Sequence, residues 1–202
     1  MFYQILNNKQ REQLNWLKLF KREFVLVDGT AIALQIGHRK SIDFDLFKKK
    51  PINFYLVKNK LRKEIKRYQL LYEEDDGLYY LIDGVKWTFL HYPYEFDTHL
   101  INDKYFKMAD LLTLAAMKSY ALGRRSKWKD YVDLYVLLKE YFSIKDIIKR
   151  SEELYKDAFS EKLFRIQLSY FKDIDFSEPI EWVNKKISDK TIKQELIKIA
   201  TS

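Results

Sequence analysis

The chain has 202 residues, of which 47% are hydrophobic and 16% are aromatic. This length suits one domain, or two small ones that share a core, and the apolar content excludes global disorder. The absence of cysteine excludes disulfides and thiolate metal sites and fits a reducing cytoplasm. No apolar run approaches the ~20 residues of a membrane span, and residues 7–12 are polar where a signal peptide would be apolar. We therefore expect a cytoplasmic protein with no membrane partner.

The net charge of +8 is unevenly distributed along the chain. Residues 1–67 have a balance of +10, whereas the remainder has a balance of −2. The densest stretch, residues 48–67, holds nine basic residues and one acidic residue. Such a patch favours a polyanionic partner, most simply RNA or a nucleotide. A solvated lysine-rich helix face would give the same pattern, so the patch alone does not choose between them.

The first hundred residues alternate between helical and strand patterns. Apolar residues at helical spacing predict helices at residues 4–22, 31–36 and 53–67. Short apolar runs predict strands at residues 24–27, 42–47 and 85–92, and a hairpin made by residues 68–72 and 78–82. Residues 1–100 should therefore form an α/β half.

After about residue 104 the pattern becomes helical. The first predicted helix carries apolar and small residues three and four apart: Met108, Leu111, Leu112, Ala115, Ser119 and Leu122. The others are predicted at residues 128–141, after a capping box that begins at Ser143, and near residues 161–172 and 179–200. We expect residues 101–202 to form a helical half that packs on the first half in one compact unit.

Two carboxylates stand out on the strand predicted at residues 42–47. Asp43 and Asp45 are two residues apart, so they should share one face while Phe44 and Leu46 face the core. Two adjacent carboxylates repel each other unless a cation lies between them, and Mg²⁺ is the usual choice beside a phosphate. Gly29 and Thr30 precede the short helix, whose N-terminal backbone N–H groups suit a nucleotide phosphate. These parts together predict a nucleotidyl-transfer site.

A second polar cluster lies between residues 110 and 133. Lys118 falls on the apolar stripe of its predicted helix, so it must find an anion or extend to solvent. Asp130 and Asp133 share one helix face next to the core, and Arg125 precedes them. A buried ion-pair network that joins two helices would also explain these charges, although such networks stabilise weakly. Several charged groups along an inward face favour a functional site.

These motifs, taken in order, resemble the AbiEii/AbiGii-type nucleotidyltransferase toxin family, a branch of the DNA polymerase β-like superfamily. In that family a Gly-rich turn with Thr or Ser precedes an Arg-x-Ser-x-Asp-x-Asp run. The matching residues here are Gly29, Thr30, Arg39, Ser41, Asp43 and Asp45. The family later carries an inward lysine, an arginine and an Asp-x-x-Asp pair, which Lys118, Arg125, Asp130 and Asp133 match. The resemblance covers about residues 24–141.

The resemblance implies an α+β fold, with a mixed nucleotidyltransferase sheet and helices followed by a C-terminal helical bundle. It also implies that Asp43 and Asp45 hold Mg²⁺, with Mn²⁺ as an alternative, and that Lys118 is catalytic. The implied nucleotide-binding residues are Gly29, Thr30, Arg39, Ser41, Lys118, Arg125, Asp130 and Asp133. The implied substrates are a nucleoside triphosphate and an RNA acceptor such as tRNA, and the implied partner is a cognate antitoxin. The family's role is that of a toxin in toxin–antitoxin or phage abortive-infection systems.

Two positions depart from the family pattern. Asp28 stands where the family has a small residue at the start of the turn. The superfamily places a third carboxylate on a neighbouring strand, and Thr88 occupies that position here. A hydroxyl cannot replace a carboxylate as a base or a strong metal ligand. Neither Asp83 nor Asp28 has a spacing that shows it takes this role.

Three hypotheses follow. The first is a Mg²⁺-dependent enzyme that transfers NMP from an NTP to an acceptor. The second, favoured by Thr88 and the basic run, is a catalytically degenerate fold that binds a nucleotide or RNA. The third is a structural protein in which the acids form ion pairs, and it predicts no affinity for NTP or metal.

Overall fold

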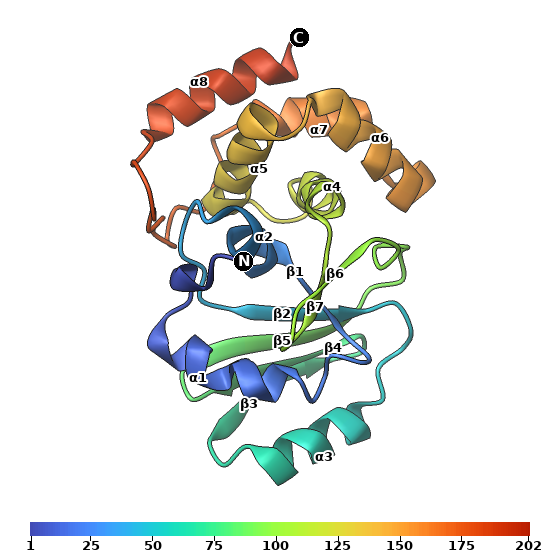
Figure 1. Cartoon of the computed structure of the whole chain (residues 1–202). Helices are drawn as coiled ribbons and strands as arrows, with labels where there is room; N and C mark the ends of the chain where they lie inside the picture. Colours follow the sequence, from blue (N-terminus) through green and yellow to red (C-terminus); the bar gives the residue numbers. More distant parts are fainter. The chain divides into compact units, whose positions relative to one another are not determined.

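The computed structural model describes residues 1–202, which divide into two compact units, Met1–Asp110 and Leu111–Ser202. The first unit carries all seven strands and three α-helices, and the second is helical (Figure 1). This arrangement confirms the expected α+β class with a mixed sheet and a C-terminal helical region. The boundary follows the last strand of the sheet.

The sheet of the first unit has the strand order β3-β4-β5-β2-β1-β7-β6. Its strands are β1 (Val25–Val27), β2 (Phe44–Lys48), β3 (Tyr68–Glu74), β4 (Gly77–Ile82), β5 (Val85–His91), β6 (Leu100–Asn102) and β7 (Lys107–Ala109). The pairs β2–β5 and β1–β7 are parallel, and the other neighbours are antiparallel. The sheet is therefore mixed, and the carboxylate strand β2 lies at its centre.

Short helices accompany this sheet. They are the 3-10 helix η1 (Tyr3–Ile5) and the α-helices α1 (Asn8–Leu17), α2 (Asp28–Ile36) and α3 (Phe54–Glu64). The helix predicted at residues 4–22 is thus divided, because Asn7 and Gln10 form a capping box that begins a new helix at Asn8. Gln13 on α1 is buried, accepts a hydrogen bond from Trp87 Nε1 at 2.7 Å and donates one to the Ile82 carbonyl at 2.8 Å. These bonds fix α1 on the strands β4 and β5.

The core of the first unit is aromatic. Phe20, Phe24, Trp87 and Phe89 are almost completely buried, and their rings contact one another with centroid distances between 4.7 and 6.2 Å. Large buried rings contribute much of the hydrophobic stabilisation of a small core. Much of the aromatic content of the chain therefore serves packing.

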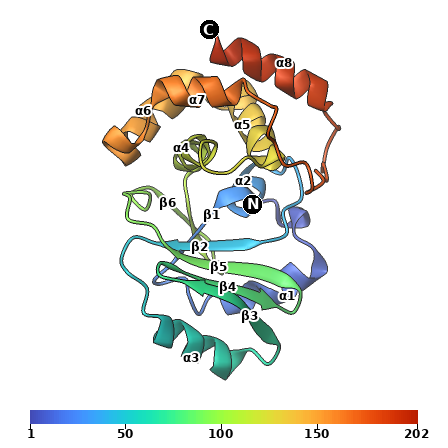
Figure 2. The ribbon, with the colours of Figure 1, turned by 180° about the vertical axis from the view of Figure 1, so that it is seen from behind.

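The helices of the second unit are α4 (Leu111–Ala121), α5 (Trp128–Glu140), α6 (Ile144–Tyr155), α7 (Glu161–Leu168) and α8 (Asp189–Ala200), with the 3-10 helix η2 (Lys156–Ala158) (Figures 1 and 2). The capping box of Ser143 and Asp146 at the start of α6 is confirmed. Helices α4 and α6 pack through stacked rings of Tyr120 and Tyr155, whose centroids are 3.8 Å apart. None of the helices is long and apolar enough to cross a membrane.

The structure differs from the expected elements at three places near and after residue 100. Met108 was expected in the first helix of the helical half, but it lies in β7, where it pairs with Leu26 of β1. The strand β6 was also missed, and α4 begins only at Leu111. The helix expected at residues 179–200 is confined to Asp189–Ala200, because Ser188 caps it by accepting a hydrogen bond from the Thr191 N–H.

Candidate functional site

The candidate site of the first unit is built on the β1–α2–β2 segment. Val25, Leu26 and Val27 are all buried, and their register with Phe47, Leu46 and Asp45 sets β1 antiparallel to β2. Since α2 begins directly after Val27, its first turn lies at the end of β2 that carries the carboxylates. The expected Gly-Thr turn is therefore the first turn of the helix itself, because α2 begins at Asp28 rather than at residue 31.

Asp28 occupies the junction between β1 and α2 with a φ of 58°, in the left-handed region that a residue with a side chain rarely adopts. This departure from the family pattern is thus accompanied by backbone strain. Strained backbone of this kind often lies at functional sites, where the surrounding structure holds it. Here the buried strand on one side and the buried helix on the other hold the junction.

Thr30 connects the first turn of α2 to the segment that leads into β2. Thr30 is 1% exposed, and its hydroxyl donates a hydrogen bond to the Asp43 carbonyl and lies 2.8 Å from Ser41 Oγ. The structure therefore brings Thr30, Ser41 and Asp43 together. The contacts of Thr30 assign it a positioning role, since its hydroxyl fixes the backbone of the residue that carries a carboxylate.

We expect Thr30→Val to lower the free energy of unfolding by about 1–3 kcal/mol, because it leaves the partly buried Asp43 carbonyl and the buried Ser41 hydroxyl without this partner. Thr30→Ser, which keeps the hydroxyl, is the matched control and should cost clearly less. Urea unfolding monitored by circular dichroism measures both variants. Equal losses for Val and Ser would show that the methyl group, and not the hydrogen bond, carries the stabilisation.

Gly29 and Arg39 meet at the same turn. A Cβ at position 29 would lie 2.5 Å from Arg39 Nη2, so only glycine lets the guanidinium approach the backbone this closely. Arg39 is 3% exposed and donates from Nη1 to the Lys40 carbonyl at 2.9 Å. The fixed cation and the N-terminal end of α2 both favour negative charge at this place.

The carboxylate strand has the predicted alternation. Phe44 and Leu46 are buried, whereas Asp43 and Asp45 are partly exposed. Asp45 pairs with Thr88 in the parallel ladder between β2 and β5, and Thr88 is 6% exposed. Because paired residues of neighbouring strands point to the same face, Thr88 lies beside Asp45, and the position at which the resemblance led us to expect a third carboxylate holds a hydroxyl.

The residues present fit a Mg²⁺ ion that is shared with a nucleotide. Mg²⁺ is usually held by one or two carboxylates, with substrate phosphate oxygens and water completing its octahedral shell. Asp43, directly before β2, and Asp45 within it are both partly exposed carboxylates, and no cluster of three acids or histidines suited to a metal occurs in the structure. The donor set therefore suits a metal that arrives with its triphosphate.

A separate polar cluster lies in the helical unit. Lys118 on α4 is 2% exposed, and its ammonium forms an ion pair with Asp130 and a second one with Asp133 at 3.2 Å. Both aspartates are completely buried on α5. Arg125 donates to both oxygens of Asp130, at 2.8 and 3.0 Å, from a side chain that is 41% exposed. The four predicted charges of this unit thus form one network with two positive and two negative groups, in which Lys118, Asp130 and Asp133 are buried and Arg125 is exposed.

Burial and the charge of this network also change the pKa of the neighbouring residue Tyr131. Burial raises the pKa of the Tyr131 hydroxyl to about 12, and the negative charge of Asp130 contributes to the rise. This hydroxyl donates to the Gln167 carbonyl at 3.1 Å. Tyr131 therefore remains protonated at neutral pH and acts as a hydrogen-bond donor.

The basic run at residues 48–67 is less uniform than its sequence indicates. Four of its lysines form ion pairs within the first unit: Lys48 and Lys60 with Glu23, Lys49 with Glu95, and Lys58 with Glu73. The remaining members, Lys50, Arg62, Lys63, Lys66 and Arg67, have no carboxylate partner. About half of the positive charge of this run is therefore available to attract a polyanion.

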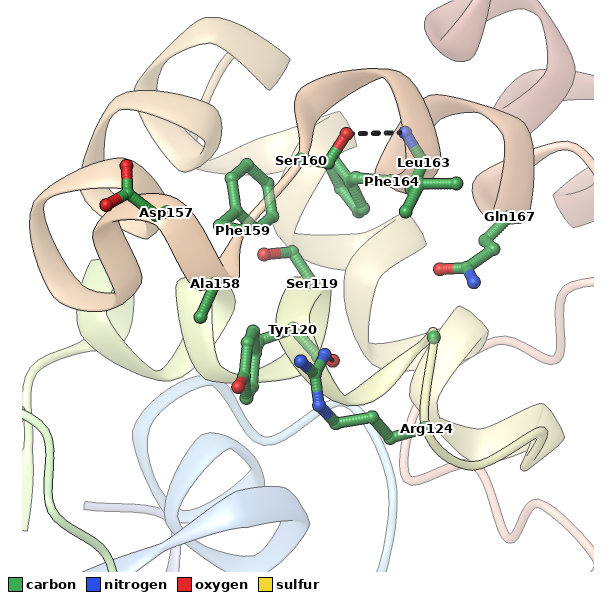
Figure 3. Close-up of a pocket in the computed structure, with 11 residues that line it drawn as sticks. Ser119, Tyr120, Arg124, Asp157, Ala158, Phe159, Ser160, Leu163, Phe164 and Gln167 are labelled. Carbon is green, nitrogen blue, oxygen red and sulfur yellow. Dashed lines mark hydrogen bonds between the residues drawn. The ribbon is translucent and has the colours of Figure 1, made fainter.

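Sequence reasoning missed a pocket of about 390 Å³ in the helical unit (Figure 3). The Arg124 guanidinium lies 3.4 Å from the ring centroid of Tyr120 and donates to the Tyr120 carbonyl, so it is held flat at the pocket wall. Gly123 lets the Gln167 side chain approach, since a Cβ there would lie 2.7 Å from its Oε1. The adjacent residues Arg124 and Arg125 could have indicated this pocket in the sequence, but only Arg125 was predicted to be a site residue.

Comparison with known proteins places the chain among nucleotidyltransferase-like structures. No model of a known protein family matches the chain. Uncharacterized protein aq_aa25 from Aquifex aeolicus (strain VF5) is 30% identical over 175 residues, which cover 83% of this chain and 84% of that protein.

Three solved structures share the fold. One is a Helicobacter pylori protein provisionally described as a nucleotidyltransferase, with a TM-score of 0.58, 19% identity and coverage of 96% of this chain and 92% of that chain. JHP933, also from Helicobacter pylori, has a TM-score of 0.58, 18% identity and coverage of 97% and 92%. MenT4, a nucleotidyltransferase toxin from Mycobacterium tuberculosis H37Rv, has a TM-score of 0.61, 12% identity and coverage of 94% and 80%. These likenesses confirm, at the level of the fold, the resemblance to nucleotidyltransferase toxins.

Proposed function

Because the chain belongs to the same family as aq_aa25 of Aquifex aeolicus and has a nucleotidyltransferase-like fold, we propose that it is a metal-dependent nucleotidyltransferase. The observation that carries the proposal is the pair of Asp45 on the central strand β2 and Asp43 directly before that strand, with the Asp43 carbonyl bonded to Thr30 in the first turn of α2. In the proposed reaction an NMP group passes from an NTP to an acceptor, and RNA, such as tRNA, is the acceptor that the resemblance and the basic run favour.

In this reaction an acceptor hydroxyl oxygen forms a bond to the α-phosphorus of the NTP. The bond from that phosphorus to the bridging oxygen breaks, pyrophosphate leaves, and the hydroxyl proton passes to water. Mg²⁺, or Mn²⁺ in its place, would be held by Asp43 and Asp45 and would neutralise the developing charge on the phosphate oxygens.

The protein groups around these carboxylates have separate tasks in the proposal. Thr30 and Ser41 fix the backbone at Asp43, and Gly29 admits Arg39 to the first turn of α2. Arg39 and the N-terminal end of α2 would attract the triphosphate. In the helical unit the resemblance assigns Lys118 a catalytic role, and Asp130 and Asp133 hold its ammonium group in place.

The biological role we propose is that of a toxin whose activity is held in check by a cognate antitoxin. Its support is the fold shared with MenT4, which is described as a nucleotidyltransferase toxin. Such a protein would slow growth when produced alone, by modifying RNA in the cytoplasm.

The second candidate function is a binding module that holds a nucleotide or RNA without chemistry. Thr88 favours it, since this residue lies beside Asp45 where a base would be needed. The binding module predicts that NTP and Mg²⁺ together raise the melting temperature, because a ligand bound only by the folded state stabilises it. It also predicts that no labelled product forms.

The test is incubation of the purified protein with Mg²⁺, each α-³²P-labelled NTP in turn, and total RNA. We expect label on RNA with the unmodified protein, and a loss of at least about 100-fold with Asp43→Ala or Asp45→Ala. Asp76→Ala, which removes an exposed acid from the β3–β4 turn, is the control and should leave the rate unchanged. Label that survives both active-site changes would refute the proposal, and a thermal shift without label would favour the binding module.

A further inference from the structure

The outer edge of the sheet at β3 offers an interaction surface that the proposed reaction does not use. Strand β3 pairs with β4 and with no other strand, so one row of its backbone N–H and C=O groups has no ladder partner. All seven of its residues are exposed. An exposed edge strand of this length is a template for pairing with another chain.

The side chains of this edge are unusually apolar. Four large residues are each between 37 and 45% exposed: Tyr68, Leu70, Leu71 and Tyr72. The strand contains no proline and no lysine, which are common devices against edge pairing. The devices that are present are one irregularity in the register, between Leu70 and Tyr72, and the charged residues Glu73 and Glu74 at the end of the strand. Helix α3 contributes the single ion pair from Lys58 to Glu73 and leaves the strand exposed.

The charges at the two ends of β3 have opposite signs. Lys66 and Arg67 precede the strand, and Glu74, Asp75 and Asp76 lie at its end and in the following turn. None of these five residues has an ion-pair partner within the chain, although Tyr79 donates a hydrogen bond to Glu74. In an antiparallel pair of two β3 strands, the basic end of each would face the acidic end of the other.

From this complementarity we infer that β3 pairs with β3 of a second copy of the same chain, antiparallel and about a two-fold axis at Leu71. This register places Arg67 opposite Asp75 and Lys66 opposite Asp76, and it joins the apolar residues of both strands. A parallel pair would instead set like charges against each other. A two-fold interface must be self-complementary, because the same surface of both copies meets across the axis. The charges at the two ends of β3 meet this requirement, since one end is basic and the other is acidic.

The interface is small, so the association is a concentration-dependent equilibrium between monomer and dimer. One strand edge and four apolar side chains per copy correspond to the low end of the areas that specific complexes bury. Cross-strand pairs of opposite charge contribute modestly, and like charges directly opposite destabilise by similar amounts. Each charge pair occurs twice in a symmetric dimer, so one charge-reversing substitution disrupts two pairs.

Sedimentation velocity of the full chain over a range of concentrations tests the inference. We expect the unmodified protein to approach twice its mass of 24.6 kDa at high concentration. Arg67→Glu and Asp75→Lys should each raise the dissociation constant at least about tenfold, and the double variant R67E/D75K should restore it. Leu71→Lys, which places two lysines at the axis, should give a monomer. Lys172→Glu makes the same charge change on an exposed lysine far from this strand in the sequence and should have no effect.

Two outcomes would overturn the inference. One is a protein that remains monomeric at every concentration, and the other is a dimer that neither Leu71→Lys nor the charge reversals weaken. Circular dichroism spectra of the variants exclude misfolding as the cause of a lost dimer. The inference does not depend on the proposed activity, because sedimentation measures mass alone.

Discussion

Replacement of Asp130 by alanine should lower the free energy of unfolding by about 3–5 kcal/mol, which is the cost of breaking a buried ion pair by removing one partner. Lys118 is 2% exposed and would keep only one of the two aspartates with which it pairs, Asp133 at 3.2 Å. Arg125 would lose both of its hydrogen bonds to Asp130. Urea unfolding at neutral pH, monitored by circular dichroism, measures this loss.

A double-mutant cycle separates the ion pair from the loss of side-chain volume. Lys118→Met alone should also be strongly destabilising, because it leaves buried negative charge without its cation. The double variant K118M/D130A should cost less than the two single losses together, since each change removes the charge that the other leaves uncompensated. Asp157→Ala, on an exposed acid, is the control and should lie within about 0.5 kcal/mol of the unmodified protein. A single-variant loss below about 1 kcal/mol would contradict the view that this network is a buried structural unit.

The network also shows what the sequence could and could not predict. The spacing of Lys118, Asp130 and Asp133 along their helices predicted that all three would face inward, and the structure confirms that they are buried. Spacing along a helix does not determine which inward groups meet, because that depends on the packing of α4 against α5. The sequence therefore left both a functional site and an ion-pair network open, and the structure shows that the ion pairs exist.

The strands of the first unit were predictable where their pattern was long enough. Alternation of apolar and acidic residues predicted a strand at residues 42–47, and β2 is found at Phe44–Lys48, so that Asp45 lies in the strand and Asp43 directly before it. The β3–β4 hairpin followed from its acidic turn. The strands β6 and β7 have only three residues each, and Met108 in β7 continues the helical spacing of Leu111 and Leu112. Pairing with β1 overrides this local pattern, and a tertiary contact of that kind leaves no periodic signal.

Contacts of single side chains were the least predictable part of the site. The resemblance placed Thr30 and Arg39 near a nucleotide, but their hydrogen bonds to Asp43 and Lys40 are local to the folded turn. From the sequence, Gly29 was expected to expose backbone N–H groups to a phosphate. In the structure it also makes room for the Arg39 guanidinium, which the sequence alone could not show.

Introduction of a carboxylate at position 88 should raise the rate of nucleotidyl transfer by about 100-fold. Thr88 is the register partner of Asp45 in the parallel ladder, so Thr88→Asp places a third acid on the face of the carboxylate pair. A positioned base contributes about 10²–10⁴ to the rate of a reaction that removes a proton from its nucleophile. The measurement is the initial rate of label incorporation at saturating NTP and Mg²⁺.

The same change predicts a signature in stability that does not need an acceptor. Thr88 is 6% exposed, so a carboxylate there is partly desolvated and repelled by Asp45, and without metal the variant should melt at a lower temperature. Mg²⁺ with NTP should restore the melting temperature, because the ligand binds only the folded state. Thr88→Asn, which has nearly the same shape without the charge, is the matched control and should show neither effect. Equal transfer rates for the Asp and Asn variants would mean that the hydroxyl at position 88 does not limit the chemistry, and that catalysis depends on Asp43 and Asp45 alone.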